Sequence, residues 1–182
     1  MKIALVTPLY PPDIEPVAVY VKELAKRLLN DSSVSILAYS RLPEKVPGVE
    51  ILSVDKRRFL PFRLAQFTKT LWTLASRVDI LYLENGASVE LPAALVILFF
   101  RKKVIVHIGD REAYAWTQKT MARKMVQSFV LMLAREIITD SPLPRPEILP
   151  FSPFPEKEFA EYEKSWTKHL LSIRQLMHYG KN

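Results

Sequence analysis

The chain alternates short apolar runs with longer stretches in which apolar residues recur at helical spacing. Continuous apolar runs predict buried strands at 3–6, 34–39, 49–54, 79–83, 104–108 and 137–139. Helical spacing between these runs predicts helices at 16–28, 60–76, 92–100 and 118–134. Strands that are apolar throughout, rather than alternating, are typical of a parallel sheet covered by helices on both faces. We therefore expect a doubly wound, Rossmann-like α/β fold with a mainly parallel sheet of six strands.

The pattern changes after residue 141. Six prolines fall between Pro142 and Pro155, which predicts an extended strap rather than a helix or a strand. Helical spacing of apolar residues returns after the strap, around Trp166. We expect three parts: a domain over 1–141, the strap over 142–157 and a C-terminal helix over 158–182 that packs back on the domain.

Composition narrows the function classes. The 182 residues are 49% hydrophobic and 25% charged, enough for the core of one ordinary domain. With no cysteine, the chain has neither a disulfide nor a thiolate metal site, and no other metal site is expected. The four glycines, at 48, 86, 109 and 180, cannot form G-x-G-x-x-G or a P-loop. This excludes nicotinamide, flavin and ordinary NTPase sites, and we expect no cofactor.

Polar residues follow the predicted fourth and fifth strands. Doubly wound sheets bind ligands at the carboxyl ends of their strands, where the strand order reverses. His107 could donate a hydrogen bond to a phosphate or a sugar hydroxyl. The substrate-binding candidates in these loops are Glu84, Asn85, Gly86, Gly109 and Asp110. A structural explanation stays open for each: a histidine bonded to neighbouring backbone, a turn, or a helix cap.

The net charge of +7 is concentrated in two segments. Residues 56–77 carry six bases and no acid, and residues 101–135 carry eight bases against two acids. Aromatic residues adjoin both basic clusters, a combination that suits an anionic membrane surface or an anionic acceptor. The candidate residues are Lys56, Arg57, Arg58, Arg101, Lys102 and Lys103. No nucleic-acid-reading module is visible, so nucleic acid is not expected as a partner. The alternative explanation of both basic clusters is a solvated loop next to aromatic residues of the core.

Several segments resemble glycosyltransferase family 4. The opening MKIALVTPLYPPDIEPVAVYVKELAKRLL is similar to the first strand and helix of these enzymes. DILYLENG, KVIVHIGD and EIITDS resemble the family's fourth, fifth and sixth strands, and EILPFSPFPEKEF lies where members pass to their second domain. The similarity covers residues 1–155, and the order and spacing of its motifs fit the family.

The resemblance implies the amino-terminal, acceptor-side half of a GT-B glycosyltransferase. His107 aligns with a histidine near the donor sugar and phosphate, so it is the catalytic candidate. Glu15 and Pro16 align with a glycine pair whose backbone approaches the donor diphosphate. Here a carboxylate would repel the diphosphate, and proline lacks the backbone donor. The nucleotide-sugar half of the family is not found in this chain, while the segment around Trp166 is similar to the last helix of full-length members.

These features together predict a glycosyltransferase-like domain that is inactive alone and part of a split sugar transferase. Its partners would be a donor-domain protein, a nucleotide sugar and an anionic or lipid acceptor. The alternatives are a non-catalytic binding module and a basic membrane-associated protein. No targeting signal is apparent and the longest apolar run, 91–100, is too short to span a bilayer, so we expect a cytoplasmic protein with peripheral membrane contact left open.

Overall fold

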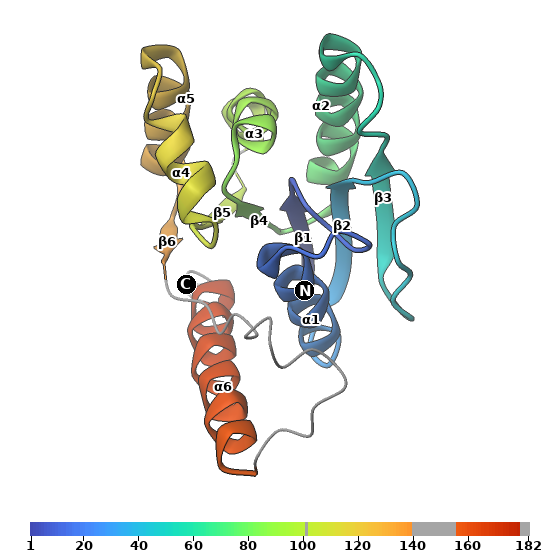
Figure 1. The fold of residues 1–182 in the computed structure, drawn as a ribbon, viewed down its shortest axis with the longest axis vertical. Coiled ribbons are helices and arrows are strands. Elements are labelled where there is room, and N and C mark those ends of the chain that lie inside the picture. The colour runs from blue at the N-terminus through green and yellow to red at the C-terminus, as the bar shows by residue number, and fades with distance from the viewer. Residues whose placement is uncertain (101, 140–155, 179–182) are drawn as a thin grey trace.

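The computed structural model describes residues 1–100, 102–139 and 156–178, and its centre is a parallel six-stranded sheet (Figure 1). The strand order is β3-β2-β1-β4-β5-β6, and each of the five strand pairings is parallel. The strands are β1 (Lys2–Thr7), β2 (Ser33–Tyr39), β3 (Glu50–Val54), β4 (Ile80–Glu84), β5 (Lys103–His107) and β6 (Glu136–Ile138). The predicted doubly wound α/β fold is confirmed, and the order reverses between β1 and β4.

Helices cover both faces of the sheet. They are α1 (Pro16–Leu28), α2 (Leu60–Arg77), α3 (Ala87–Phe99), α4 (Arg111–Thr117), α5 (Met121–Leu133) and α6 (Glu156–His178). In Figure 1, α2, α3 and α5 lie on one side of the sheet, and α1 and α6 lie on the other. Most of the predicted strap, residues 142–155, lies outside the described residues.

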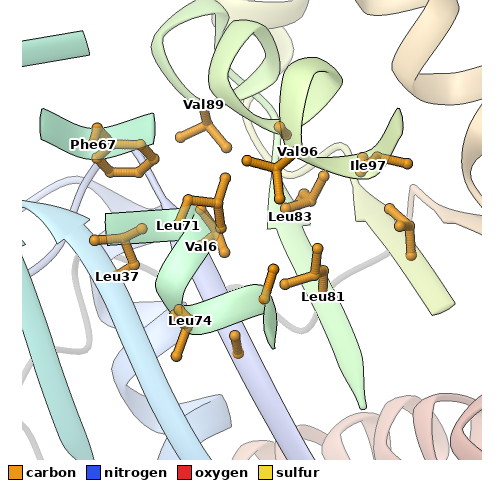
Figure 2. Close-up of a cluster of buried hydrophobic side chains, with 14 of the residues drawn as sticks. Val6, Leu37, Phe67, Leu71, Leu74, Leu81, Leu83, Val89, Val96 and Ile97 are labelled. Atoms are coloured by element: carbon orange, nitrogen blue, oxygen red, sulfur yellow. The ribbon is translucent and has the colours of Figure 1, made fainter. Parts of the chain in front are cut away.

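The sheet separates two hydrophobic cores. Successive strand residues point to opposite faces, so β1 sends Ala4 and Val6 into one core and Ile3 and Leu5 into the other. Figure 2 shows the first core, in which strand residues such as Val6 pack against side chains of α2 and α3. Because both faces of the inner strands β1, β2, β4 and β5 are buried, these strands read as largely apolar runs.

Helix α6 completes the second core together with α1. Trp166 is fully buried there and stacks on the ring of Tyr20 from α1, with 5.5 Å between the ring centroids. Arg27 of α1 donates to both carboxylate oxygens of Glu163, at 2.8 and 2.6 Å. The Arg27 guanidinium also lies over the Trp166 ring, 4.8 Å from its centroid. The C-terminal segment is thus part of the layer that covers this face of the sheet.

Helix α3 begins earlier than its proline suggests. The sequence pattern predicted a start at Pro92, but the helix begins at Ala87 and contains Pro92. Proline has no N–H to donate to the carbonyl four residues earlier, which here belongs to Ser88. The hydroxyl of Tyr39 donates to that carbonyl instead, at 2.9 Å. The vacant acceptor is therefore satisfied, and the helix continues through the proline.

A short helix, α4, precedes α5 and was not predicted. The side chain of Asp110 caps it by accepting from the backbone N–H of Ala113 at 2.8 Å. The predicted helix over 118–134 begins instead at Met121, because Thr120 has an extended backbone. Asp110 preceding a run of residues with helical propensity was the available signal for α4.

Candidate functional site

A cleft of about 1140 Å³ opens at the carboxyl edge of the sheet. The loops after β1, β4 and β5 contribute Pro8, Leu9, Gly86 and Asp110 to its wall. Lys119 comes from the connection between α4 and α5, and the remaining lining comes from α2, α3, α4 and α5. Its charged lining residues are Arg63, Glu90, Asp110, Glu112, Lys119 and Arg123. The cleft thus lies where a doubly wound sheet binds ligands, with cations and carboxylates in its wall.

Two arginines of the cleft are held without an acidic partner among the described residues. Arg63 donates from Nη1 to the backbone carbonyl of Lys56 at 2.8 Å, while its Nε is buried without a hydrogen-bond partner. Arg123 lies over the ring of Trp116, with 3.5 Å from the guanidinium carbon to the ring centroid. An anionic ligand group could therefore bind here without displacing an existing ion pair.

Reciprocal hydrogen bonds join the loops after β4 and β5. The side-chain amide of Asn85 donates to the carbonyl of Asp110 at 2.7 Å and accepts from the Asp110 N–H at 3.0 Å. The Asn85 N–H also donates to the carbonyl of His107 at 3.0 Å. Gly86 follows with φ of +152°, and a Cβ there would lie 3.1 Å from Cγ of Pro8. The structure thus brings Asn85, Gly86 and Asp110 together, as the sequence predicts for neighbouring strand ends.

A buried acid–base pair lies beside these loops. Nδ1 of His107 is 2.8 Å from both carboxylate oxygens of Glu84, and the two side chains are 0% and 1% exposed. The two residues are register partners at the ends of β5 and β4. Burial raises the pKa of Glu84 above its usual 4.5, an effect that the adjacent His107 opposes. Burial likewise raises the pKa of Glu90, whose carboxylate accepts from Gln127 at 3.0 Å and from the N–H of Gly86 at 3.3 Å.

The ring of His107 points to the α1–α6 side of the sheet. Its centroid is 4.7 Å from that of Tyr20 in α1 and 6.1 Å from that of His169 in α6. Its Nε2 is buried without a hydrogen-bond partner among the described residues. Neither His107 nor Glu84 lines the cleft, which opens between helices of the opposite layer.

Gly109 has a steric role next to this ring. A Cβ on Gly109 would lie 2.6 Å from Cε1 and 3.0 Å from Nδ1 of His107. Real Cβ atoms do not approach other atoms so closely, so a larger residue would displace the ring or the loop. Glycine is thus required here for backbone to pass close to His107.

Beside the His107 ring, a hydrogen-bond network joins α1, β4 and α6. The hydroxyl of Tyr20 is 2.6 Å from that of Tyr82 and 2.5 Å from Nε2 of His169. All three side chains are buried, and burial raises the pKa of both tyrosines well above 10. The sequence analysis did not identify these residues, because tyrosines within apolar runs resemble ordinary core residues. Their only signal was a hydroxyl that needs a partner at a buried position.

The other candidate residues lie apart from the acid–base pair. Glu15 and Pro16 are exposed at the start of α1, and Glu15 makes no side-chain cap. Lys56 pairs with Asp13, and Lys103 donates from Nζ to the carbonyl of Met177 at 3.1 Å. Arg57 and Arg58 are exposed, Lys102 is half-buried, and Arg101 lies outside the described residues. Within 1–100, 102–139 and 156–178, no group of three or more potential ligands could hold a metal ion.

Comparisons with known proteins extend the fold assignment. No protein-family profile matches the chain, and no curated protein sequence matches it. Similar solved structures include a UDP-N-acetylglucosamine 2-epimerase from Listeria monocytogenes described as putative, at 16% identity, 78% coverage of this chain and a TM-score of 0.51. The epimerase of Methanocaldococcus jannaschii aligns at 10% identity, 78% coverage and 0.50. Anabaena HepE, solved with UDP and glucose, aligns at 16% identity, 78% coverage and 0.53.

The chain spans about two fifths of each of these proteins: 39%, 40% and 38% of their lengths. At such low identity the likeness concerns the fold alone. The six-stranded parallel sheet with flanking helices and a C-terminal helix matches a Rossmann-like half of the GT-B fold.

Proposed function

We propose that this chain is the acceptor-side half of a sugar-transfer site. In this proposal the cleft at the carboxyl edge binds the acceptor, and a separate nucleotide-sugar-binding unit, in a partner protein, supplies the donor. The assignment to family 4 belongs to the same proposal. The observation that carries it is the cleft itself, which lies at the strand-order reversal of a GT-B-like half. Its wall holds two arginines that have no acidic partner among the described residues.

The chemistry of the cleft suits a sugar acceptor with an anionic group. Arg63, Lys119 and Arg123 can bind phosphate or carboxylate oxygens. Trp116 offers an aromatic face, already in contact with Arg123 at 3.5 Å. Glu90, Asp110 and Glu112 can accept hydrogen bonds from sugar hydroxyls. A site open to solvent on one side cannot exclude water from the reaction, so we expect no sugar transfer by this chain alone.

Fluorine NMR of the fluorotryptophan-labelled protein tests ligand binding. The three tryptophans report on separate places: Trp116 lines the cleft, Trp72 lies on α2, and Trp166 of α6 is buried against α1. We expect phosphorylated sugars and glycosides to shift the Trp116 resonance and to leave that of Trp166 unchanged. The substitutions W72F, W116F and W166F assign the resonances.

A transfer assay tests the donor half. The chain is co-expressed with proteins that consist of the nucleotide-sugar half of a GT-B enzyme, and labelled UDP-glucose or UDP-N-acetylglucosamine is added with each acceptor. Association and transfer that neither protein achieves alone are the expected result. A panel in which no acceptor shifts Trp116 and no donor half associates would contradict the proposal.

One observation favours a second function, that of a non-catalytic binding module. His107 is fully buried, bonded to Glu84 and directed away from the cleft, so a substrate in the cleft does not reach its ring. Under this alternative, ligands still shift Trp116, but no donor half restores transfer. Under the first proposal, the associated pair transfers sugar. A lower rate of transfer in the His107→Gln variant would then assign to His107 the catalytic role that the family resemblance implies.

A further inference from the structure

The outer sides of α2 and α3 expose large apolar side chains next to one another. We call this surface the α2–α3 face; it consists of Phe59, Leu60, Phe62, Trp72, Leu91, Leu95, Leu98 and Phe99. Trp72 links the two helices, since its ring centroid lies 4.9 Å from those of both Phe99 and Phe100. Figure 1 places both helices on the side of the sheet opposite α1 and α6.

Helix α3 is apolar around most of its circumference. Val89, Ala93, Val96 and Ile97 face the sheet and belong to the first core. Leu91, Leu95, Leu98 and Phe99 recur at helical spacing on the side away from it, and Leu98 and Phe99 are 60% and 69% exposed. A helix at the surface of a domain normally carries polar residues on its outer side. The outer side of α3 is therefore suited to an apolar environment.

An apolar groove of about 670 Å³ runs between the two helices. Its lining includes Leu64 and Trp72 of α2 and Leu91, Pro92 and Leu95 of α3. Trp72, Leu91 and Leu95 are exposed and also line the groove, so the groove opens within the α2–α3 face. Surfaces of this kind mark contacts with proteins or membranes when they are rimmed by polar residues.

The rim of this face, taken as the polar residues of 56–77 and 91–109, is basic. No Asp or Glu occurs in residues 56–77 or 91–109. Arg57, Arg58 and Lys69 are exposed there and form no ion pair within the described part of the chain. Two other bases of the first segment are occupied, Lys56 by Asp13 and Arg77 by Glu50. Arg57 and Arg58, two of the candidates from the sequence, are thus exposed next to Phe59, and Lys69 adds a third exposed base.

We propose that the α2–α3 face docks on a phospholipid bilayer that contains anionic lipid. Rings and leucines would enter the boundary between headgroups and acyl chains, while Arg57, Arg58 and Lys69 would lie against lipid phosphates. Charge complementarity selects this occupant. A second copy of the chain would bring the same basic rim against itself, whereas an anionic surface matches both the apolar centre and the basic rim.

Vesicle binding tests this proposal with the whole chain. The protein is mixed with vesicles of phosphatidylcholine alone or of phosphatidylcholine with phosphatidylglycerol, and the bound fraction is measured by co-sedimentation. We expect binding to the anionic vesicles that weakens as salt rises. In single-tryptophan variants, spin-labelled lipid should quench the fluorescence of Trp72, which is 41% exposed, much more than that of the buried Trp166. Binding to neither vesicle, or bound protein whose Trp72 is not quenched, would overturn the proposal.

Paired variants separate this face from general basicity. R57E/R58E reverses two bases of the rim, and K164E/K168E reverses two exposed bases on α6 with the same change in net charge. We expect the first pair to weaken vesicle binding about fivefold or more for each base removed, and the second pair to weaken it much less. Equal losses from both pairs would overturn the assignment to this face.

Apolar variants complete the test. Leu98→Asn on α3 and Leu171→Asn on α6 change leucines that are 60% and 52% exposed. Only the first is expected to release the protein from vesicles, with both variants folded by circular dichroism. The proposal would be overturned if the chain does not bind vesicles but dimerises in sedimentation experiments, and if Leu98→Asn abolishes the dimer. That result would assign the face to a second copy of the chain. A Trp116 response to acceptors is independent of these results, so failure here leaves the proposed function standing.

Discussion

Both carboxylate oxygens of Glu84 lie 2.8 Å from Nδ1 of His107, and the pair is closed off from solvent. Parallel pairing of β4 and β5 brings the two residues to the same register position. Their side chains share the face of the sheet that α1 and α6 cover, where the ring of Tyr20 lies over His107. The pair is thus part of the packing between the sheet and this helical layer as well as a candidate for chemistry.

Glu84 makes stability depend on pH. Because its pKa is raised in the folded chain, the folded state binds more protons than the unfolded state between pH 4.5 and the raised value. The free energy of unfolding therefore falls as pH rises through this window, by about 1.4 kcal/mol for each unit of pKa elevation. We expect Glu84→Gln to remove this part of the pH dependence, measured by urea unfolding across the window.

The pKa of Glu90 is raised as well, so both carboxyl groups contribute to the pH dependence of the wild-type free energy of unfolding. The difference between the wild-type and Glu84→Gln curves isolates Glu84. Glu161→Gln, an exposed carboxyl on α6, is the matched control. A wild-type–minus–variant difference that stays flat above pH 4.5 would contradict the prediction.

Gly109→Ala is expected to destabilise the fold. The new Cβ would meet Cε1 of His107 at 2.6 Å, and overpacking of this kind costs about 1–3 kcal/mol. Chemical denaturation measures the loss. In a His107→Ala background the ring is gone, so the same substitution should cost much less; equal costs in the two backgrounds would show that the ring is not the obstacle.

Tyr20→Phe is expected to loosen α6. The substitution removes one hydroxyl that joins Tyr82 at 2.6 Å and His169 at 2.5 Å, and it leaves both of those buried groups without this partner. The expected cost is about 1–3 kcal/mol, with faster hydrogen exchange of the α6 amides. Tyr39→Phe removes a buried hydroxyl on the opposite side of the sheet and should leave α6 exchange unchanged. Similar exchange in both variants would refute a specific link to α6.

Arg123→Ala is expected to weaken ligand binding in the cleft. The guanidinium lies over Trp116 and has no acidic partner among the described residues, so it is available to an anion. Loss of one charge-assisted contact corresponds to about 1.5–3 kcal/mol, or roughly tenfold or more in the dissociation constant of a phosphorylated acceptor. Titration followed by Trp116 fluorine NMR measures this. Lys124→Ala, on the same helix and outside the cleft lining, serves as the control and should bind normally.

The inner strands β1, β2, β4 and β5 were predictable because their burial on both faces appears directly in the sequence as largely apolar runs. The observed strand order is one of the few arrangements that alternating strands and helices allow. The start of α3 was not predictable, because the helix continues through Pro92 only when Tyr39, from a distant strand, satisfies the carbonyl of Ser88. Such a contact leaves no local pattern.

The candidate site was also only partly predictable from the sequence. Sequence reasoning identified Glu84, Asn85, Gly86, His107, Gly109 and Asp110, because loops at one sheet edge converge. It did not separate those that line the cleft from those that point to the other layer, since this depends on the side-chain alternation at each strand end. Arg63, Trp116 and Arg123 were missed because they come from helices whose cleft-facing sides depend on tertiary packing.

Leu64 and Leu91 line both the large cleft and the groove between α2 and α3. The two hollows therefore share a wall, and the groove opens on the surface proposed to rest on a bilayer. With the protein docked in this way, an acceptor could keep its hydrocarbon tail among the lipids while its polar end entered the cleft. The protein would then encounter its acceptor by diffusion in two dimensions, along the membrane plane, rather than from solution.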